Sequence, residues 1–154
     1  MGKAILGGVE FCVDDGRLIN VTNSGECKDV RIPDKLPTGE WIHSISPNFC
    51  YGNYNNIAIS DNITVISPMA FAQANVNIVQ WSSGCKVITR GCFCESSIKQ
   101  IVNIDDVGLI EPSAFRNTNI VEFKWPSKCE TIPSYCFHGS ELKAISNIDN
   151  VKKN

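Results

Sequence analysis

The sequence lacks several features that would assign it to a common functional class. It has no apolar run near the roughly 18 residues that a membrane-spanning helix needs, and no cluster of lysine and arginine. Its 14 basic and 16 acidic residues leave a formal net charge of -2. No glycine-rich phosphate loop, G-x-S-x-G or H-E-x-x-H motif occurs. These absences argue against membrane insertion, against nucleic-acid binding and against the best-known catalytic motifs.

The first residues, MGKAILGGVEF, do not have the pattern of a secretory leader. Their apolar patch is about three residues long, whereas the core of a signal peptide takes about 7 to 15. The beginning of the chain is therefore consistent with a cytoplasmic protein, or with a surface or secreted protein whose leader has been removed.

Five phenylalanines are spaced 22 residues apart, each preceded by a related segment such as ISPMAF or IEPSAF. They are Phe49, Phe71, Phe93, Phe115 and Phe137. We write +8 for the eighth residue after the phenylalanine of its repeat, and we call residues at the same position of successive repeats a column. Apolar residues recur in the columns +5, +8, +14 and +17. One such repeat is too small to bury its own apolar side, so the repeats are expected to stack around a shared core.

The spacing around +5, +8 and +10 matches the L-x-x-L-x-L strand of leucine-rich repeats. Serine or proline before most of these phenylalanines favours a short helix or 3₁₀ turn there. The sequence therefore predicts a leucine-rich-repeat solenoid, β-rich with short helical turns and 22-residue rungs. About five to six rungs are expected over residues 29–154, the last of them incomplete.

Residues 1–28 are predicted to form an N-terminal β-hairpin cap, because strand-like runs flank Asp15-Gly16. At the other end, the final rung has no cap pattern. We expect this rung to be covered by more of a longer chain or by self-association.

A second period of 44 residues overlies the first. Trp81 and Trp125 occupy column +10, where the other repeats have Ile59, Asn103 and Asn147. Because +10 points inward in the leucine-rich pattern, both tryptophans are expected in the core.

The I-x-x-x-A/C-F element followed by L/I-x-x-I/V, with its period of 22, resembles the BspA-like, or treponemal, class of leucine-rich repeats. The resemblance covers about residues 30–154. It implies a surface or secreted binding protein that adheres to host matrix proteins or to other cells.

The eight cysteines invite a disulfide framework or a metal site, but their columns argue otherwise. Cys92 stands in the column of Ala70 and Ala114, which indicates that this core position accepts only a small residue. A free cysteine packs as a small hydrophobic residue. Cysteines that share a column lie two repeats apart. At a strand spacing of about 4.8 Å their Cα atoms are about 10 Å apart, which exceeds the roughly 7 Å limit for a disulfide. Cys85, Cys92, Cys129 and Cys136 are expected to fill the core.

Other chemistry is also disfavoured. Cys94 and His138 share a column with Arg116 between them, which places them too far apart for a catalytic dyad. Asp61, Asp105 and Asp149 are expected to cap turns rather than to share a cation. We expect no enzyme, no metal and no cofactor.

The remaining candidate is the exposed side of the strands, columns +7 and +9, where solenoids recognise proteins. The predicted binding residues are Asn56, Ala58, Ile78, Gln80, Gln100, Val102, Glu122, Lys124, Ala144 and Ser146. The hypothesis is a non-enzymatic protein-binding module at the cell surface, with an extracellular matrix or host surface protein as ligand. The alternatives are a structural spacer and an intracellular scaffold segment of a larger repeat protein.

Overall fold

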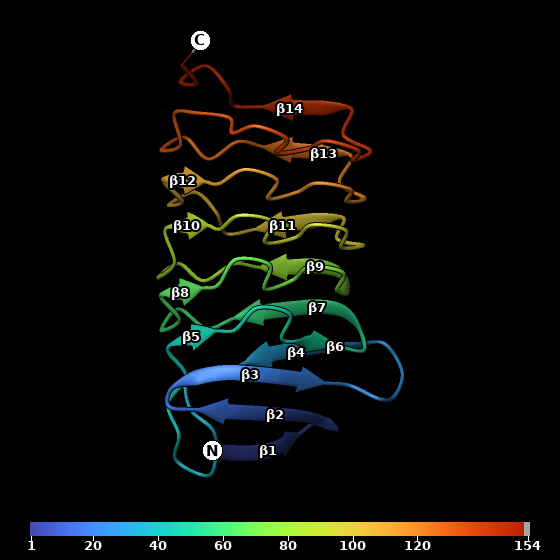
Figure 1. The fold of residues 1–154 in the computed structure, drawn as a ribbon, viewed down its shortest axis with the longest axis vertical. Coiled ribbons are helices and arrows are strands. Elements are labelled where there is room, and N and C mark those ends of the chain that lie inside the picture. The colour runs from blue at the N-terminus through green and yellow to red at the C-terminus, as the bar shows by residue number, and fades with distance from the viewer. Residues whose placement is uncertain (153–154) are drawn as a thin grey trace.

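The computed structural model describes residues 1–152, in which β-strands and turns follow one another along the long axis of the molecule (Figure 1). The N-terminus and the last described residues lie at opposite ends of this stack (Figure 1). Residues 153 and 154, the last two of the predicted repeat region, lie outside the described residues.

The strands fall into three groups. The N-terminal group is β1 (Gly2–Leu6), β2 (Val9–Asp14) and β3 (Arg17–Thr22). The strands of one long face are β4 (Lys28–Ile32), β7 (Asn53–Ile59), β9 (Asn75–Gln80), β11 (Gln100–Val102), β13 (Glu122–Lys124) and β14 (Ala144–Ser146). Two-residue strands elsewhere are β5 (Ser44–Ile45), β6 (Cys50–Tyr51), β8 (Val65–Ile66), β10 (Val87–Ile88) and β12 (Leu109–Ile110).

The N-terminal strands form an antiparallel meander. β2 and β3 make the hairpin expected around Asp15 and Gly16, whose φ angles of 48° and 74° suit a two-residue hairpin turn. The sequence analysis did not anticipate β1. The free edge of β3 pairs in parallel with β5 and β6, so the meander is continuous with the first repeat.

From β7 onward, paired residues on the long face are separated by 22 positions, whereas Val30 of β4 pairs with Ile57, 27 positions later. Asn56 pairs with Ile78, and Ile78 pairs with Gln100, in the parallel sheet β4-β7-β9-β11. Glu122 pairs in the same way with Ala144 in the separate sheet β13-β14. The period in the sequence therefore sets the strand register.

The short helical turns expected before each phenylalanine are not formed in residues 1–152. The N–H groups of Ala70 and Ala72 do donate to carbonyls three residues earlier, at 3.2 and 3.1 Å, as they would in a 3₁₀ turn. However, Met69 and Gln73 have left-handed φ angles of 62° and 60°. Residues of this handedness end a right-handed helix, so the segment becomes a series of tight turns.

The same two positions are left-handed in the three following repeats. They are Gly91, Ser113 and Tyr135 before the phenylalanine, and Glu95, Asn117 and Gly139 after it. The turn geometry is thus a property of the repeat and does not depend on glycine.

The phenylalanine column forms the axis of the core. Phe49, Phe71, Phe93 and Phe115 are fully buried, and their ring centroids succeed one another at 4.9, 4.9 and 5.4 Å. Phe137 continues the stack 5.5 Å beyond Phe115 and is half-buried. Phe49 meets Phe71 edge to face and the later rings are stacked, and both arrangements add to the stabilisation that each ring contributes through its buried area.

Column +10 alternates between two roles. Trp81 and Trp125 are buried, as expected, and the indole of Trp81 donates to the carbonyl of Cys85 at 3.0 Å. Asn103 and Asn147 instead face outward with left-handed φ angles. Their amides donate at 2.8 Å to the carbonyls of Trp81 and Trp125 in the preceding repeats. Each tryptophan repeat is therefore tied to the asparagine repeat after it.

Candidate binding surface

Alternation along the strands separates core residues from surface residues on the long face. Ile57 and Val79 of column +8 are fully buried, while their neighbours in columns +7 and +9 point outward. Of the predicted binding residues, four are half-buried: Asn56, Ala58, Ile78 and Val102. The other six are exposed: Gln80, Gln100, Glu122, Lys124, Ala144 and Ser146.

The structure assembles these ten residues as two groups. Six of them lie on β7, β9 and β11 of one sheet, and four lie on β13 and β14 of another. The two sheets are separate, so the row of outward residues is interrupted between β11 and β13. Nothing in the repeat spacing signals this interruption.

A groove of about 1150 Å³ runs over the C-terminal part of this face. Its lining includes the predicted residues Ile78, Gln100, Glu122, Lys124, Ala144 and Ser146. It also includes residues that the sequence analysis did not single out, among them Asn55, Asn77, Lys99, Asn119 and Val121. The groove carries both charges and several amides, with apolar surface between them.

Two rows of polar side chains flank the strand face. In column +4, the side-chain amide of Asn75 donates to the side-chain oxygen Oδ1 of Asn53. The Ser97 hydroxyl in turn donates to Oδ1 of Asn75 at 3.0 Å. In column +6, the Asn77 amide donates to Asn55 at 3.4 Å. The recurrence of asparagine at intervals of 22 is the sequence signal that could have revealed these rows.

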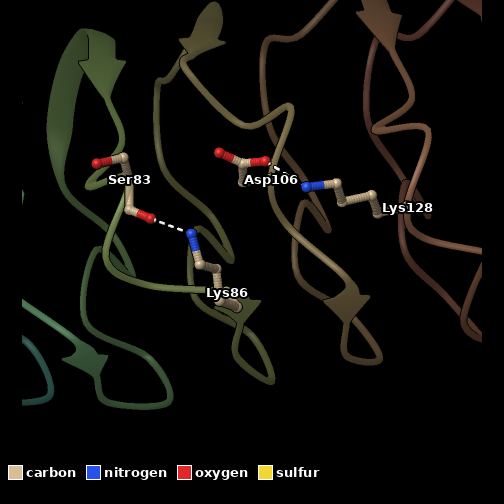
Figure 2. A network of polar contacts seen from close by, with 4 residues as sticks. All are labelled: Ser83, Lys86, Asp106 and Lys128. Atoms are coloured by element: carbon tan, nitrogen blue, oxygen red, sulfur yellow. Dashed lines mark hydrogen bonds and ion pairs between the residues drawn. The ribbon is translucent and has the colours of Figure 1, made fainter.

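A different edge of the stack carries charged contacts (Figure 2). The Lys128 ammonium lies 2.5 Å from the Asp106 carboxylate of the preceding repeat, and the Lys86 ammonium donates to the Ser83 carbonyl at 2.5 Å (Figure 2). Both partners of the ion pair are exposed, so the pair contributes little to stability. The hydrogen bond and charge of Lys128, with a smaller effect of Lys86, lower the pKa of Asp106.

This ion pair makes a pH-dependent prediction. Because the folded state lowers the pKa of Asp106, the carboxylate is stabilised in its ionised form. Its contribution is present above the unfolded pKa and is lost as the pH falls through the lower, folded pKa. In an NMR titration of the Asp106 carboxyl carbon, Lys128→Met is expected to raise the midpoint. An unchanged midpoint would show that Lys128 does not hold this carboxylate in solution.

Asp61 has the turn-capping role expected from the sequence. Its carboxylate accepts a hydrogen bond from the Ser83 N–H of the following repeat at 2.9 Å. Backbone and side-chain hydrogen bonds from Ser83 lower the pKa of Asp61.

The cysteines predicted to fill the core are buried. Cys85, Cys92, Cys129 and Cys136 are each at most 3% exposed, and all eight cysteines are unpaired. Burial raises the pKa of the Cys92 and Cys136 thiols to about 12. Because the thiolate is the nucleophile, these thiols are unreactive at neutral pH while the protein is folded.

Thiol labelling tests this distribution. In the folded protein at neutral pH, an aromatic disulfide reagent is expected to modify Cys27 first, because Cys27 is exposed, and to leave Cys92 unmodified. In denaturant without reductant, all eight thiols should titrate. Cys27→Ser should remove the fast phase, and rapid modification of Cys92 in the folded state would contradict the buried position.

Side chains that commonly bind metals are dispersed through the described part of the chain. Within residues 1–152, no group of three or more histidine, cysteine, aspartate or glutamate side chains could hold a metal ion. The same residues contain no helix of the length and hydropathy that a membrane span requires. Cys94 is half-buried and His138 is exposed, in repeats separated by that of Arg116.

The architecture defines the chain as a leucine-rich-repeat protein, and comparison with known proteins agrees. A leucine-rich cell surface protein from Faecalibacterium prausnitzii A2-165 superposes with a TM-score of 0.60 at 18% identity, covering 98% of this chain and 44% of that one. A leucine-rich repeat protein from Eubacterium ventriosum ATCC 27560 superposes with a TM-score of 0.52 at 18% identity, covering 97% and 42%. At this identity the likeness concerns the fold. The chain spans less than half the length of either protein.

Residues 43–153 match the model of the BspA type leucine rich repeat region, in six copies. The chain therefore belongs to the BspA-type leucine-rich repeat family, as its sequence motif indicates. No curated protein matches the chain.

Proposed function

We propose that the chain is a segment of a solenoid with 22-residue rungs that acts as a non-enzymatic protein-binding module in cell-surface adhesion. The observation that carries the proposal is the long strand face. None of the ten outward residues of columns +7 and +9 is buried, and six of them line a groove of about 1150 Å³.

The composition of this face suits a protein ligand. Lys124 and Glu122 supply charges of both signs, Gln100 supplies an amide, and Ile78 and Val102 supply apolar surface. Solenoids use extended faces of this kind for recognition, and a few central residues with good packing carry most of the energy at a protein interface. A surface location is supported by the neighbour described as a cell surface protein. We propose an extracellular matrix or host surface protein as the ligand.

A binding assay on immobilised extracellular matrix proteins tests the proposal. We call the chain in which alanine replaces Gln80, Val102, Glu122 and Lys124 the strand-face variant. It is expected to bind at least about tenfold more weakly, which corresponds to a loss of about 1.4 kcal/mol of binding free energy. The control carries three alanines at the charged edge, at Lys86, Asp106 and Lys128, and should bind as the parent chain does. Equal binding by the parent and the strand-face variant would overturn the proposal.

A second candidate function is stacking on another repeat surface, as a spacer or by self-association. It is favoured by the exposure of apolar residues in the last two repeats: Ile132 is 42% exposed, whereas Ile110 of the same column is 1% exposed. Ile145 is half-buried where Ile57 and Val79 are fully buried. Sedimentation at rising protein concentration should then show association that Ile145→Lys abolishes, and a monomer at every concentration would argue against self-association.

A further inference from the structure

The break between β11 and β13 is a local opening in a stack that is otherwise closely packed. β11 is the edge of one parallel sheet and β13 begins another, and a cavity of about 270 Å³ lies between them. We call this cavity, lined by residues 100–105 and 122–124, the seam. A strand edge carries N–H and C=O groups that point away from its own sheet, so two such edges face each other across the seam.

The opening is confined to the strand face. On the turn side, the same two repeats remain joined by the N–H of Phe93 donating to the Ala114 carbonyl at 2.8 Å and that of Glu95 donating to the Arg116 carbonyl at 2.8 Å. Just before β13, the Asn119 N–H donates to the Ile98 carbonyl at 3.2 Å. Repeats on both sides of the seam are therefore held in place while the strands between them part.

Phe123 is the residue that distinguishes this place in the stack. Column +8 holds the aliphatic residues Ile57, Val79, Ile101 and Ile145 in every other repeat. The Phe123 ring packs against Phe115 at 5.0 Å and Phe137 at 5.1 Å, and it forms the buried floor of the seam. We attribute the separation of β13 from β11 to the larger volume of this ring.

We propose that the seam receives one branched aliphatic side chain of a protein ligand, whose main chain crosses β11 and β13. The proposal rests on the proposed function and names the point of the strand face where the ligand is anchored. A cavity of about 270 Å³ lies below the roughly 300 to 1,000 Å³ of pockets that hold whole small molecules. It therefore has room for one side chain together with the peptide groups that flank it.

The lining of the seam also favours a peptide segment as the occupant. Phe123, Ile104 and Val102 provide apolar surface for an aliphatic group. Gln100, Glu122 and Lys124 stand at the exposed rim with donors and acceptors for the peptide groups beside that side chain. An apolar pocket with a polar rim is the usual setting of an anchor residue in a protein interface.

The test uses N-acetyl-leucine methylamide as the probe in an amide NMR titration of the described chain. Shift changes are expected in residues 100–105 and 122–124, and N-acetyl-glycine methylamide, which lacks the side chain, should cause none. Val102→Phe should fill the seam and remove the changes, whereas Gln80→Phe, at the same position of the preceding repeat, should leave them. Shifts elsewhere, no shifts, or shifts that survive Val102→Phe would overturn the proposal.

Phe123→Ile provides an independent test. Restoring the aliphatic residue of column +8 should bring β11 and β13 together, which would abolish the leucine response and increase hydrogen-exchange protection between these strands. Unchanged protection and an unchanged leucine response would overturn the assignment. If the strand-face variant loses matrix-protein binding while the parent chain gives no leucine response, the seam proposal fails alone. If binding is unaffected by that variant, the proposed function fails as well.

Discussion

Phe93→Ala is expected to lower the free energy of unfolding by about 3–5 kcal/mol, the range for removing a buried phenylalanine ring from a packed core. The ring is fully buried between Phe71 at 4.9 Å and Phe115 at 5.4 Å. Its loss would leave a cavity that both neighbouring repeats line, and the turn-side hydrogen bonds would resist collapse around it. Urea unfolding followed by circular dichroism measures the change.

Phe137→Ala is the matched control, because it removes the same ring from the same column at a half-buried position. We expect a cost smaller by at least about 1 kcal/mol, since less apolar area leaves the core. Equal costs for the two variants would mean that the phenylalanine column is not continuous in solution.

Gly52→Ala is expected to cost at least about 3 kcal/mol, from a disallowed backbone conformation together with a steric clash. The φ angle of Gly52 is +107°, and a Cβ atom there would lie 2.0 Å from the carbonyl oxygen of Asn23. Asn23 cannot retreat easily, because its amide donates at 2.8 Å to the carbonyls of Glu26 and Asn53. The substitution therefore strains the junction between β3 and β6.

Gly39→Ala separates the two causes. Its φ angle is +109°, nearly that of Gly52, but a Cβ atom there meets nothing within 4 Å. We expect only the backbone cost of about 1–3 kcal/mol. Chemical denaturation of both variants gives the difference, which measures the clash with Asn23. No difference would show that the β3–β6 junction can open to accept a side chain.

The parts of the fold that follow from the period could be predicted from the sequence. Constant spacing put Phe93 in a column with its neighbours, and the alternation of Trp81 with Asn103 gave the second period. Burial of Cys92 followed from its alanine column mates. Each of these features depends on which residues are 22 positions apart in the sequence, because stacking of the repeats places such residues next to one another.

Features that depend on local backbone geometry could not be predicted in the same way. Met69, Ser113 and Tyr135 adopt left-handed conformations, although none of these residue types favours them. The N–H groups of Met69 and Ser113 each donate at 3.1 Å to a carbonyl of the following repeat, so these turns depend on contacts between repeats that no local signal reveals. The seam depends on the size of a single side chain, Phe123, in a column that reads simply as apolar.

The seam also affects how the stack responds to force. Along most of the long face, parallel strand ladders would resist bending away from that face. Between β11 and β13 no such ladder exists in residues 1–152, while the Phe93 and Phe115 rings and the turn-side hydrogen bonds hold the opposite side. A load applied across the molecule would therefore bend it here first, with the phenylalanine column as the pivot. This repeat boundary would act as a built-in hinge, and filling the seam would stiffen it.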